Sequence, residues 1–329
     1  MKRRGFLGLV AGAAAWPLAA QAQQGAGGLR RLGVLAGYAA NDPLGQLLAS
    51  ILPQGLAALG WSEGQNVHID WRWASGDPKL YESYAAQLVA LRPDLLVVQS
   101  SPAVAALRRS TNTIPTVFVM ITDPLGQGFV NNLAHPAGNM TGFGDYDPPI
   151  ASKWVELHKQ IRPNIASVAL LYNPASTPFA DLILGAAAPA ARSFAVMARS
   201  SVCRDELDID AAMKLARDER GGVKVVPEVF TTVHRDAIVT AATRHRVPAV
   251  YPDEISTTRG ELMSYGIDPA DVFLRSASYV DRILKGENPG DLPVQNPTKF
   301  RLTINLKTAR AIGLPVPPTL LALADAVTE

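Results

Sequence analysis

From residue 29 onward the chain alternates short apolar runs with longer segments in which apolar side chains recur every three or four positions. The short runs are apolar along their whole length, which is typical of parallel strands covered by helices on both faces. The first half of the chain therefore predicts βαβ units and a parallel sheet. The predicted strands are residues 31–37, 66–73, 94–99 and 116–121, and the predicted helices are residues 44–59 (bent at Pro53), residues 81–91 and a segment that begins at Ser101 and Pro102.

The same cycle repeats in the second half of the chain, and the two blocks meet around residues 138–149. Two successive α/β blocks of similar length predict two lobes of one architecture. The predicted strands of the second block are residues 167–172, 223–229 and 249–251, and its predicted helices are residues 178–195 and 235–245.

The last part of the chain is long enough to cross to the first lobe and return, so we expect several hinge segments rather than one linker. It contains residues 262–266, a predicted helix at 269–285, a segment rich in Pro, Gly and Asn at 286–297 and a predicted strand at 301–306. The predicted first lobe is residues 30–145 plus 266–290, and the predicted second lobe is residues 146–265 plus 291–329.

The first 22 residues have the three parts of an export signal. A basic start is followed by an apolar stretch and by the small-x-small sequence Ala20-Gln21-Ala22. The pair Arg3-Arg4 ahead of a mildly apolar stretch favours the twin-arginine type, which exports folded proteins, over the general type. We expect cleavage after Ala22 and a periplasmic mature protein. A retained membrane anchor is the weaker interpretation, because the apolar stretch is short.

Composition narrows the class of protein. The chain has 329 residues, 48% of them hydrophobic and 18% charged, so it can fold around sizeable cores. Its formal net charge changes from +2 to −1 when Lys2, Arg3 and Arg4 leave with the signal. A mature chain without a block of Lys or Arg does not have the charge pattern of a nucleic-acid-binding protein. The single Cys203 excludes an intramolecular disulfide.

Polar or aromatic clusters follow six of the predicted strands directly. Ligands of open parallel sheets bind beyond the carboxyl ends of the strands, so these clusters are candidates for a binding site. Helix capping is the alternative explanation for each, and the two roles are compatible because a helix start presents backbone donors to the cleft. The clusters are residues 37–41, 100–102 and 122–124 in the first block and residues 173–176, 230–232 and 252–254 in the second.

The common enzyme motifs are missing from the sequence. No Ser stands in a G-x-S-x-G turn, and the GVLAG run at residues 33–37 has neither dinucleotide-loop spacing nor a phosphate-loop Lys. The five histidines, at positions 68, 135, 158, 234 and 245, have no pair at the spacing of a helical metal site. The sequence therefore predicts no catalytic residue, no metal and no cofactor.

Three ordered motifs carry a resemblance to a known family: residues 113–118 (TIPTVF), 122–130 (TDPLGQGFV) and 135–142 (HPAGNMTG). Residues 60–67 (GWSEGQNV) and 300–309 (FRLTINLKTA) support it. In these motifs the chain resembles the periplasmic substrate-binding components of ABC transporters, a family with tryptophan- and tyrosine-transport members. The resemblance extends over residues 30 to 315.

The resemblance implies a type I periplasmic binding fold, with two Rossmann-like lobes, a multi-crossover hinge and a ligand held between the lobes. It implies a small-molecule ligand and an ABC transporter membrane permease as partners, no cofactor, and a monomer. At the matching positions it implies ligand contacts from Tyr38, Ser100, Ser101, Thr122 and Asp123 in the first lobe and from Asn173, Phe230, Asp253 and Tyr265 in the second.

The leading hypothesis is thus a non-enzymatic solute receptor of an ABC importer. Hydroxyls and helix-start amides after the third and fourth strands would accept a carboxylate, Asp253 or Asp123 would bind an ammonium, and the aromatic residues would flank an apolar part. An amino acid, aromatic ones included, satisfies this set. The alternatives are a periplasmic hydrolase that uses Ser101 with a remote His, and a ligand-sensing subunit that reports to a receptor kinase.

Overall fold

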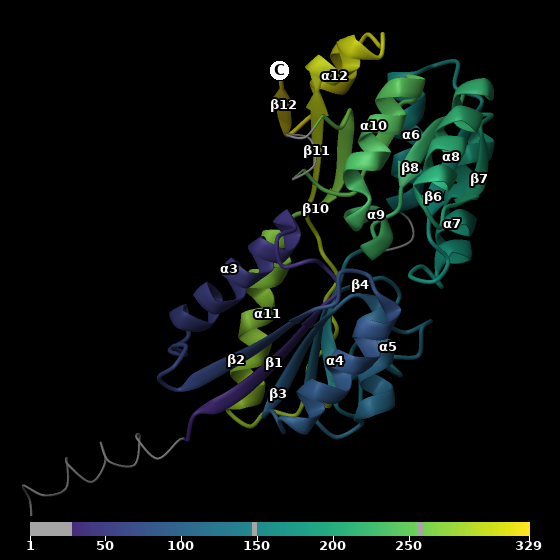
Figure 1. The fold of residues 1–329 in the computed structure, drawn as a ribbon. Helices are drawn as coiled ribbons and strands as arrows, with labels where there is room; N and C mark the ends of the chain where they lie inside the picture. The colour runs from purple at the N-terminus through teal and green to yellow at the C-terminus, as the bar shows by residue number, and fades with distance from the viewer. Residues whose placement is uncertain (1–27, 147–149, 255–259) are drawn as a thin grey trace, which may run out of the picture.

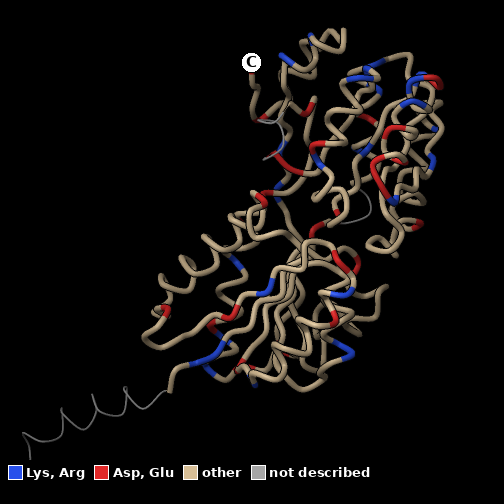
Figure 2. The backbone as a smooth tube through the Cα atoms, in the orientation of Figure 1, with Lys and Arg blue, Asp and Glu red and all other residues tan. Residues whose placement is uncertain are grey.

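The computed structural model describes residues 28–146, 150–254 and 260–329. These residues form two α/β lobes, each built on its own sheet (Figure 1). The predicted pair of lobes is confirmed, whereas the predicted export signal lies outside the described residues. Basic and acidic residues are interspersed along the backbone of both lobes (Figure 2). Within the described ranges, no helix is both long enough and apolar enough to cross a membrane.

The first lobe has a five-stranded sheet in which every neighbouring pair of strands is parallel. Its strand order is β2-β1-β3-β4-β5. The third strand is buried along its whole length, as expected for a sheet covered on both faces. The strands are β1 Arg30–Ala36, β2 Val67–Trp73, β3 Leu95–Gln99, β4 Thr116–Ile121 and β5 Met140–Gly144.

Four helices cover this sheet, two on each face. α3 (Pro43–Ala58) and α11 (Pro269–Leu284) share one apolar cluster, and α4 (Pro78–Ala90) and α5 (Ser101–Ser110) share the other. Three of them begin at an Asp-Pro pair in which the Asp side chain accepts a backbone N–H of the first turn. Figure 1 shows α11, in the colour of the C-terminal part, lying beside α3.

The second lobe has a seven-stranded sheet in the order β12-β11-β10-β9-β8-β6-β7. Its neighbouring strands are parallel except for the antiparallel pair β10 and β11. The strands are β6 Ser167–Tyr172, β7 Met197–Val202, β8 Gly222–Val225, β9 Ala249–Tyr251, β10 Met263–Ile267, β11 Phe300–Asn305 and β12 Ala326–Thr328.

Helices also cover both faces of the second sheet. α6 (Ile150–Ile161) and α7 (Ala180–Ser193) pack on one face, and α8 (Glu206–Asp218) and α10 (Arg235–His245) pack on the other. Shorter helices complete the lobe: α9 Val229–Val233, α12 Leu306–Ala311 and α13 Pro318–Leu321.

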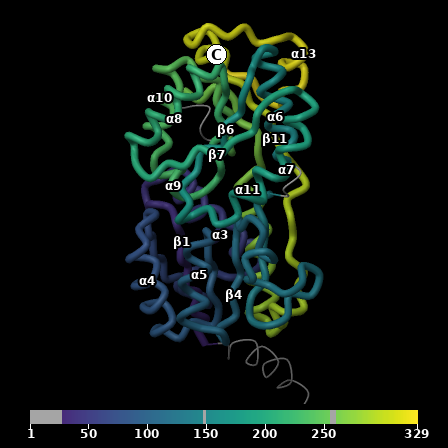
Figure 3. The backbone as a smooth tube through the Cα atoms, turned by 90° about the vertical axis from the view of Figure 1, so that its right-hand side faces the viewer, coloured from purple at the N-terminus to yellow at the C-terminus, as the bar shows by residue number. Residues whose placement is uncertain are grey.

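In the described residues the chain passes between the two lobes at three places: after β5, between β10 and α11, and ahead of β11. The short 3₁₀ helix η2 (Pro289–Asp291) still contacts β5. The amide of Gln295 donates to the Gly142 carbonyl at 3.0 Å, and the amide of Gly144 donates to the Gln295 carbonyl at 2.8 Å. The predicted transfer to the second lobe at residue 291 is therefore too early. Figure 3 shows the yellow segment running from one lobe to the other.

The structure corrects two predicted boundaries that affect the site. The predicted join at residues 138–149 contains β5, the last strand of the first sheet. A Cβ on Gly142 would lie 1.9 Å from the Phe118 carbonyl oxygen, so the strands approach closely here. The predicted strand 223–229 ends at Val225, and α9 begins at Val229. The four strands predicted for the first lobe are confirmed as β1 to β4, and they belong to one sheet.

Candidate functional site

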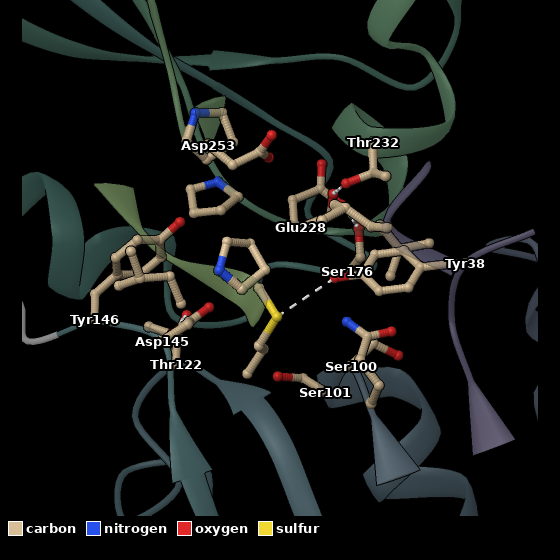
Figure 4. Close-up of a pocket in the computed structure, with 18 of the residues that line it drawn as sticks. Tyr38, Ser100, Ser101, Thr122, Asp145, Tyr146, Ser176, Glu228, Thr232 and Asp253 are labelled. Carbon is tan, nitrogen blue, oxygen red and sulfur yellow. Dashed lines mark hydrogen bonds between the residues drawn. The ribbon is translucent and has the colours of Figure 1, made fainter. Parts of the chain in front are cut away.

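A cavity that is partly open to solvent lies between the lobes, where the carboxyl ends of the strands of both sheets meet. Figure 4 shows polar and aromatic side chains around it, with Ser100, Ser101 and Thr122 on the first-lobe side and Asp253 and Thr232 on the second-lobe side. No Lys or Arg is among the described residues that line it. An anionic group of a ligand would therefore have to be bound by neutral donors.

The start of α5 supplies such donors. Ser100 is the N-cap residue of α5, and its side chain makes no capping hydrogen bond with the helix. Its hydroxyl points instead toward the Tyr81 hydroxyl, 3.5 Å away. The Ser101 hydroxyl accepts a hydrogen bond from Gln127 Nε2 at 3.0 Å. The first-turn amides and these hydroxyls give this edge of the cavity a surplus of donors, which favours a carboxylate.

Asp145 follows β5 and is almost completely buried at the cavity wall. The Thr122 hydroxyl donates to its Oδ1 at 2.7 Å. Burial raises the pKa of Asp145 to about 7, although the Thr122 hydroxyl and nearby backbone amides oppose the shift. A cationic group in the cavity would stabilise the ionised carboxylate and offset the cost of its burial.

Glu228 lies on the second-lobe side and is occupied by its own loop. Its carboxylate accepts the amides of Phe230 at 2.6 Å and Thr231 at 3.1 Å at the start of α9. The Ser176 hydroxyl also donates to it. Burial raises the pKa of Glu228 to about 7, against the effect of these hydrogen bonds. Glu228 thus ties the loop after β6 to the start of α9, and both segments line the cavity.

Apolar and aromatic surface fills the rest of the lining. Tyr38 comes from the first lobe, Phe179 comes from the second, and Tyr146 lies on the segment that leaves β5. All three are buried. The Tyr38 hydroxyl donates to Met120 Sδ at 3.7 Å, and the Tyr146 ring packs edge-on against Trp154. A ligand with both polar and flat apolar parts would be matched by this lining.

The lobes contact each other beside the cavity. Arg235 at the start of α10 lies 3.3 Å from Asp42 at the start of α3 and 3.9 Å from Glu261 in its own lobe. The Val229 side chain reaches the Gly37 backbone so closely that a Cβ on Gly37 would be 2.7 Å from it. These contacts hold the two walls of the cavity together.

Five of the nine ligand contacts predicted from the sequence line the cavity: Tyr38, Ser100, Ser101, Thr122 and Asp253. The other four lie elsewhere. Asp123 closes a turn by accepting the Gly126 amide, and Asn173 does the same for Ala175. The Phe230 ring packs at a tilt against His234 in an outer groove between the lobes, and the Tyr265 ring stacks on Phe300.

Several lining residues escaped the sequence prediction. Asp145 and Tyr146 follow β5, and their strand was predicted as a linker. Glu228 follows β8, but the predicted strand ran past it to residue 229. Ser176 and Thr232 stood within two of the predicted strand-end clusters without being chosen. Correct strand ends would have added Asp145, Tyr146 and Glu228 to the clusters, because the strand-end rule itself holds for this cavity.

A family model described as ABC transporter substrate binding protein matches residues 46–328. The tyrosine-binding protein of Clostridioides difficile (strain R20291) is 26% identical to this chain over 259 residues, which are 78% of this chain and 73% of that protein.

Two solved structures are similar to this one over 91% of this chain and 99% of theirs. One is a conserved domain protein from Vibrio cholerae, with 28% identity and a TM-score of 0.84. The other is an ABC domain in complex with L-Trp from Streptococcus pneumoniae, with 26% identity and a TM-score of 0.82.

Proposed function

This chain belongs to the family of ABC transporter substrate-binding proteins, and from that membership we propose that it captures an aromatic amino acid between its lobes and presents it to the permease of an importer. Its fold is the type I periplasmic binding fold, and proteins of this family bind small molecules and act with ABC permeases. The observation that carries the proposal is the cavity between the lobes, with neutral donors at one edge, carboxyl groups at others and aromatic rings between them.

The carboxylate of the amino acid is bound at the start of α5. The hydroxyls of Ser100 and Ser101 and the first-turn amides of this helix converge there. A helix start favours an anion through its amides and its dipole, so no Lys or Arg is required.

The ammonium group is bound by the carboxyl groups of Asp145 and Asp253, one from each side of the cavity. An ammonium beside Asp145 supplies the positive charge that the buried carboxylate needs. The first lobe thus binds the carboxylate of the zwitterion, and one carboxyl group from each lobe binds its ammonium.

The aromatic side chain of the ligand packs among Tyr38, Tyr146 and Phe179. Two relatives support this class of ligand: the C. difficile relative is a tyrosine-binding protein, and the S. pneumoniae structure contains L-Trp. Because the ligand contacts both lobes, its binding free energy favours the closed arrangement.

Export and assembly complete the proposal. Residues 1–22 act as a twin-arginine signal that is cleaved after Ala22, and the mature chain works in the periplasm as a monomer. Because the family is one of substrate-binding proteins, we propose no catalytic role for Ser101, which lines the cavity.

A thermal-shift and calorimetric screen of the full chain against the common L-amino acids tests this function. A ligand that binds only the native form raises the melting temperature by mass action. We expect L-Trp, L-Tyr or L-Phe to give the largest shift and to bind with 1:1 stoichiometry by calorimetry. A chain that shifts with none of the amino acids would contradict the proposal.

A further inference from the structure

Met120 occupies an irregularity in the first sheet. Val119 pairs with Phe143, and the next pair is Ile121 with Gly144, so β4 contains one residue more than its partner strand at this point. Met120 is the extra residue, and its φ of 57° lies in the left-handed region. Bulges are uncommon between parallel strands, and they redirect side chains next to functional sites.

The bulge changes which side of the sheet the following residues face. Val119 belongs to the cluster shared by α3 and α11, and Phe118 belongs to the cluster shared by α4 and α5. In a regular strand Met120 would join Phe118, because side chains alternate. Instead Met120 packs against the same cluster as Val119, and Ile121 joins Phe118. The extra residue therefore turns Met120 toward the cavity side.

Thr122 is placed by the same bulge. If β4 were regular and Met120 took its turn in the alternation, the Thr122 side chain would share the face of Phe118 and point toward α4 and α5. With the bulge, Thr122 lines the cavity and its hydroxyl reaches Asp145. The bulge thus places two side chains in the cavity lining, the apolar Met120 and the polar Thr122.

A left-handed backbone is unfavourable for any residue with a Cβ. Gly would adopt the same φ without this steric cost. Such strain persists where the surrounding structure requires the side chain, most often beside ligands. The Met120 side chain has such a place: its sulfur accepts the Tyr38 hydroxyl, and both residues line the cavity.

We propose that Met120 is a specificity-determining residue, whose side chain forms the surface on which the ring of an aromatic amino acid packs. The inference rests on the proposed function and adds to it the residue that separates aromatic from aliphatic ligands. A thioether makes favourable contacts with aromatic rings and adapts to their shape, because it is unbranched and polarisable. The Tyr38 hydroxyl donates to the sulfur and so orients it.

The test measures dissociation constants by calorimetry for L-Trp, L-Tyr, L-Phe and L-Leu with the full chain and its variants. We expect Met120→Ala to weaken the preferred aromatic ligand by about tenfold or more and to change L-Leu by less than about threefold. Met120→Leu keeps the apolar volume and should stay within about threefold of wild type for the aromatic ligand.

Two further variants separate ligand contact from damage to the fold. Met120→Gly removes the side chain while accepting the left-handed backbone, so it should bind as weakly as Met120→Ala without losing thermal stability. Met140→Leu changes the methionine of the partner strand, which packs in the α4 and α5 cluster, and should leave affinity unchanged.

The outcomes distinguish the inference from the proposed function. If wild type binds an aromatic amino acid and Met120→Ala binds it within about threefold of wild type, the inference is wrong and the proposed function stands. If wild type binds none of the aromatic amino acids, the proposed function is wrong and the inference falls with it.

Discussion

Arg235 of the second lobe and Asp42 of the first form an ion pair across the cleft, with 3.3 Å between Nη1 and Oδ2. Both side chains are largely buried, and the other oxygen of Asp42 caps α3 by accepting the Leu44 amide at 2.8 Å. The pair can exist only while the lobes are together. The pair therefore stabilises the closed arrangement, and it does not contribute to the stability of either lobe by itself.

Arg235→Gln should favour the open arrangement and weaken ligand binding by about tenfold, because Asp42 loses its cationic partner when the lobes close. Small-angle scattering should show a larger radius of gyration for the variant in the presence of ligand. Arg244→Gln is the matched control, since Arg244 lies on the same helix and pairs with Asp210 inside the second lobe. Scattering curves and affinities equal to wild type for both variants would contradict a role for the pair in closure.

Asp145→Asn and Asp253→Asn should each weaken an amine-bearing ligand by about tenfold or more, on the order of 1.4 kcal/mol. Each change removes a negative charge from the wall that binds the ammonium. Asp123→Asn should have no effect, because Asp123 lies outside the cavity and Asn retains the oxygen that accepts the Gly126 amide. Calorimetry with the preferred amino acid measures all three. A variant whose dissociation constant is unchanged removes that carboxyl group from the ammonium site.

Asp145 also predicts a pH dependence of stability. Burial raises its pKa to about 7 in the folded protein, so between roughly pH 4 and pH 7 the folded chain holds a proton that the unfolded chain releases. This contribution is fully present below about pH 4 and is lost as the pH rises through about 7. Urea unfolding at about pH 5 and pH 8 gives the free energy of unfolding at each pH. We expect this free energy to decrease less between the two pH values in Asp145→Asn than in wild type. Glu228 acts in the same direction, because burial raises its pKa to about 7 as well.

Lys224 predicts the opposite trend. It is fully buried in β8, its ammonium has no hydrogen-bond partner among the described residues, and it lies 4.4 Å from the centre of the Trp154 ring. Burial lowers its pKa to about 7, so from about pH 7 to pH 10 the unfolded chain binds a proton that the folded chain releases, and stability rises with pH.

Lys224→Met should abolish this rise between about pH 7 and pH 10, because Met carries no titratable group. Lys214→Met on the exposed side of α8 is the control and should leave the pH profile unchanged. The free energy of unfolding from urea titrations at several pH values gives the measurement. A rise in stability that persists in Lys224→Met would contradict this role of the ammonium.

The sequence predicts the two lobes and the edge of each sheet where the cavity lies, because apolar alternation and strand polarity are local properties. It does not predict which side chains reach the cavity, because that depends on single-residue features of strand geometry. The strand β8 ends at Val225 although apolar residues continue to Val226, so the predicted strand end missed Glu228. The bulge at Met120 has no sequence signal, since Met is an ordinary strand residue and carries no preference for positive φ.

The placement of α11 affects how the protein is made. This helix closes the apolar face of the first sheet together with α3, yet the ribosome synthesises it after most of the second lobe. Until residues 269–284 emerge, the nascent first lobe carries an uncovered apolar face, which favours aggregation. A contiguous fragment that ends ahead of Pro269 would lack this cover of the first sheet, and we expect it to aggregate.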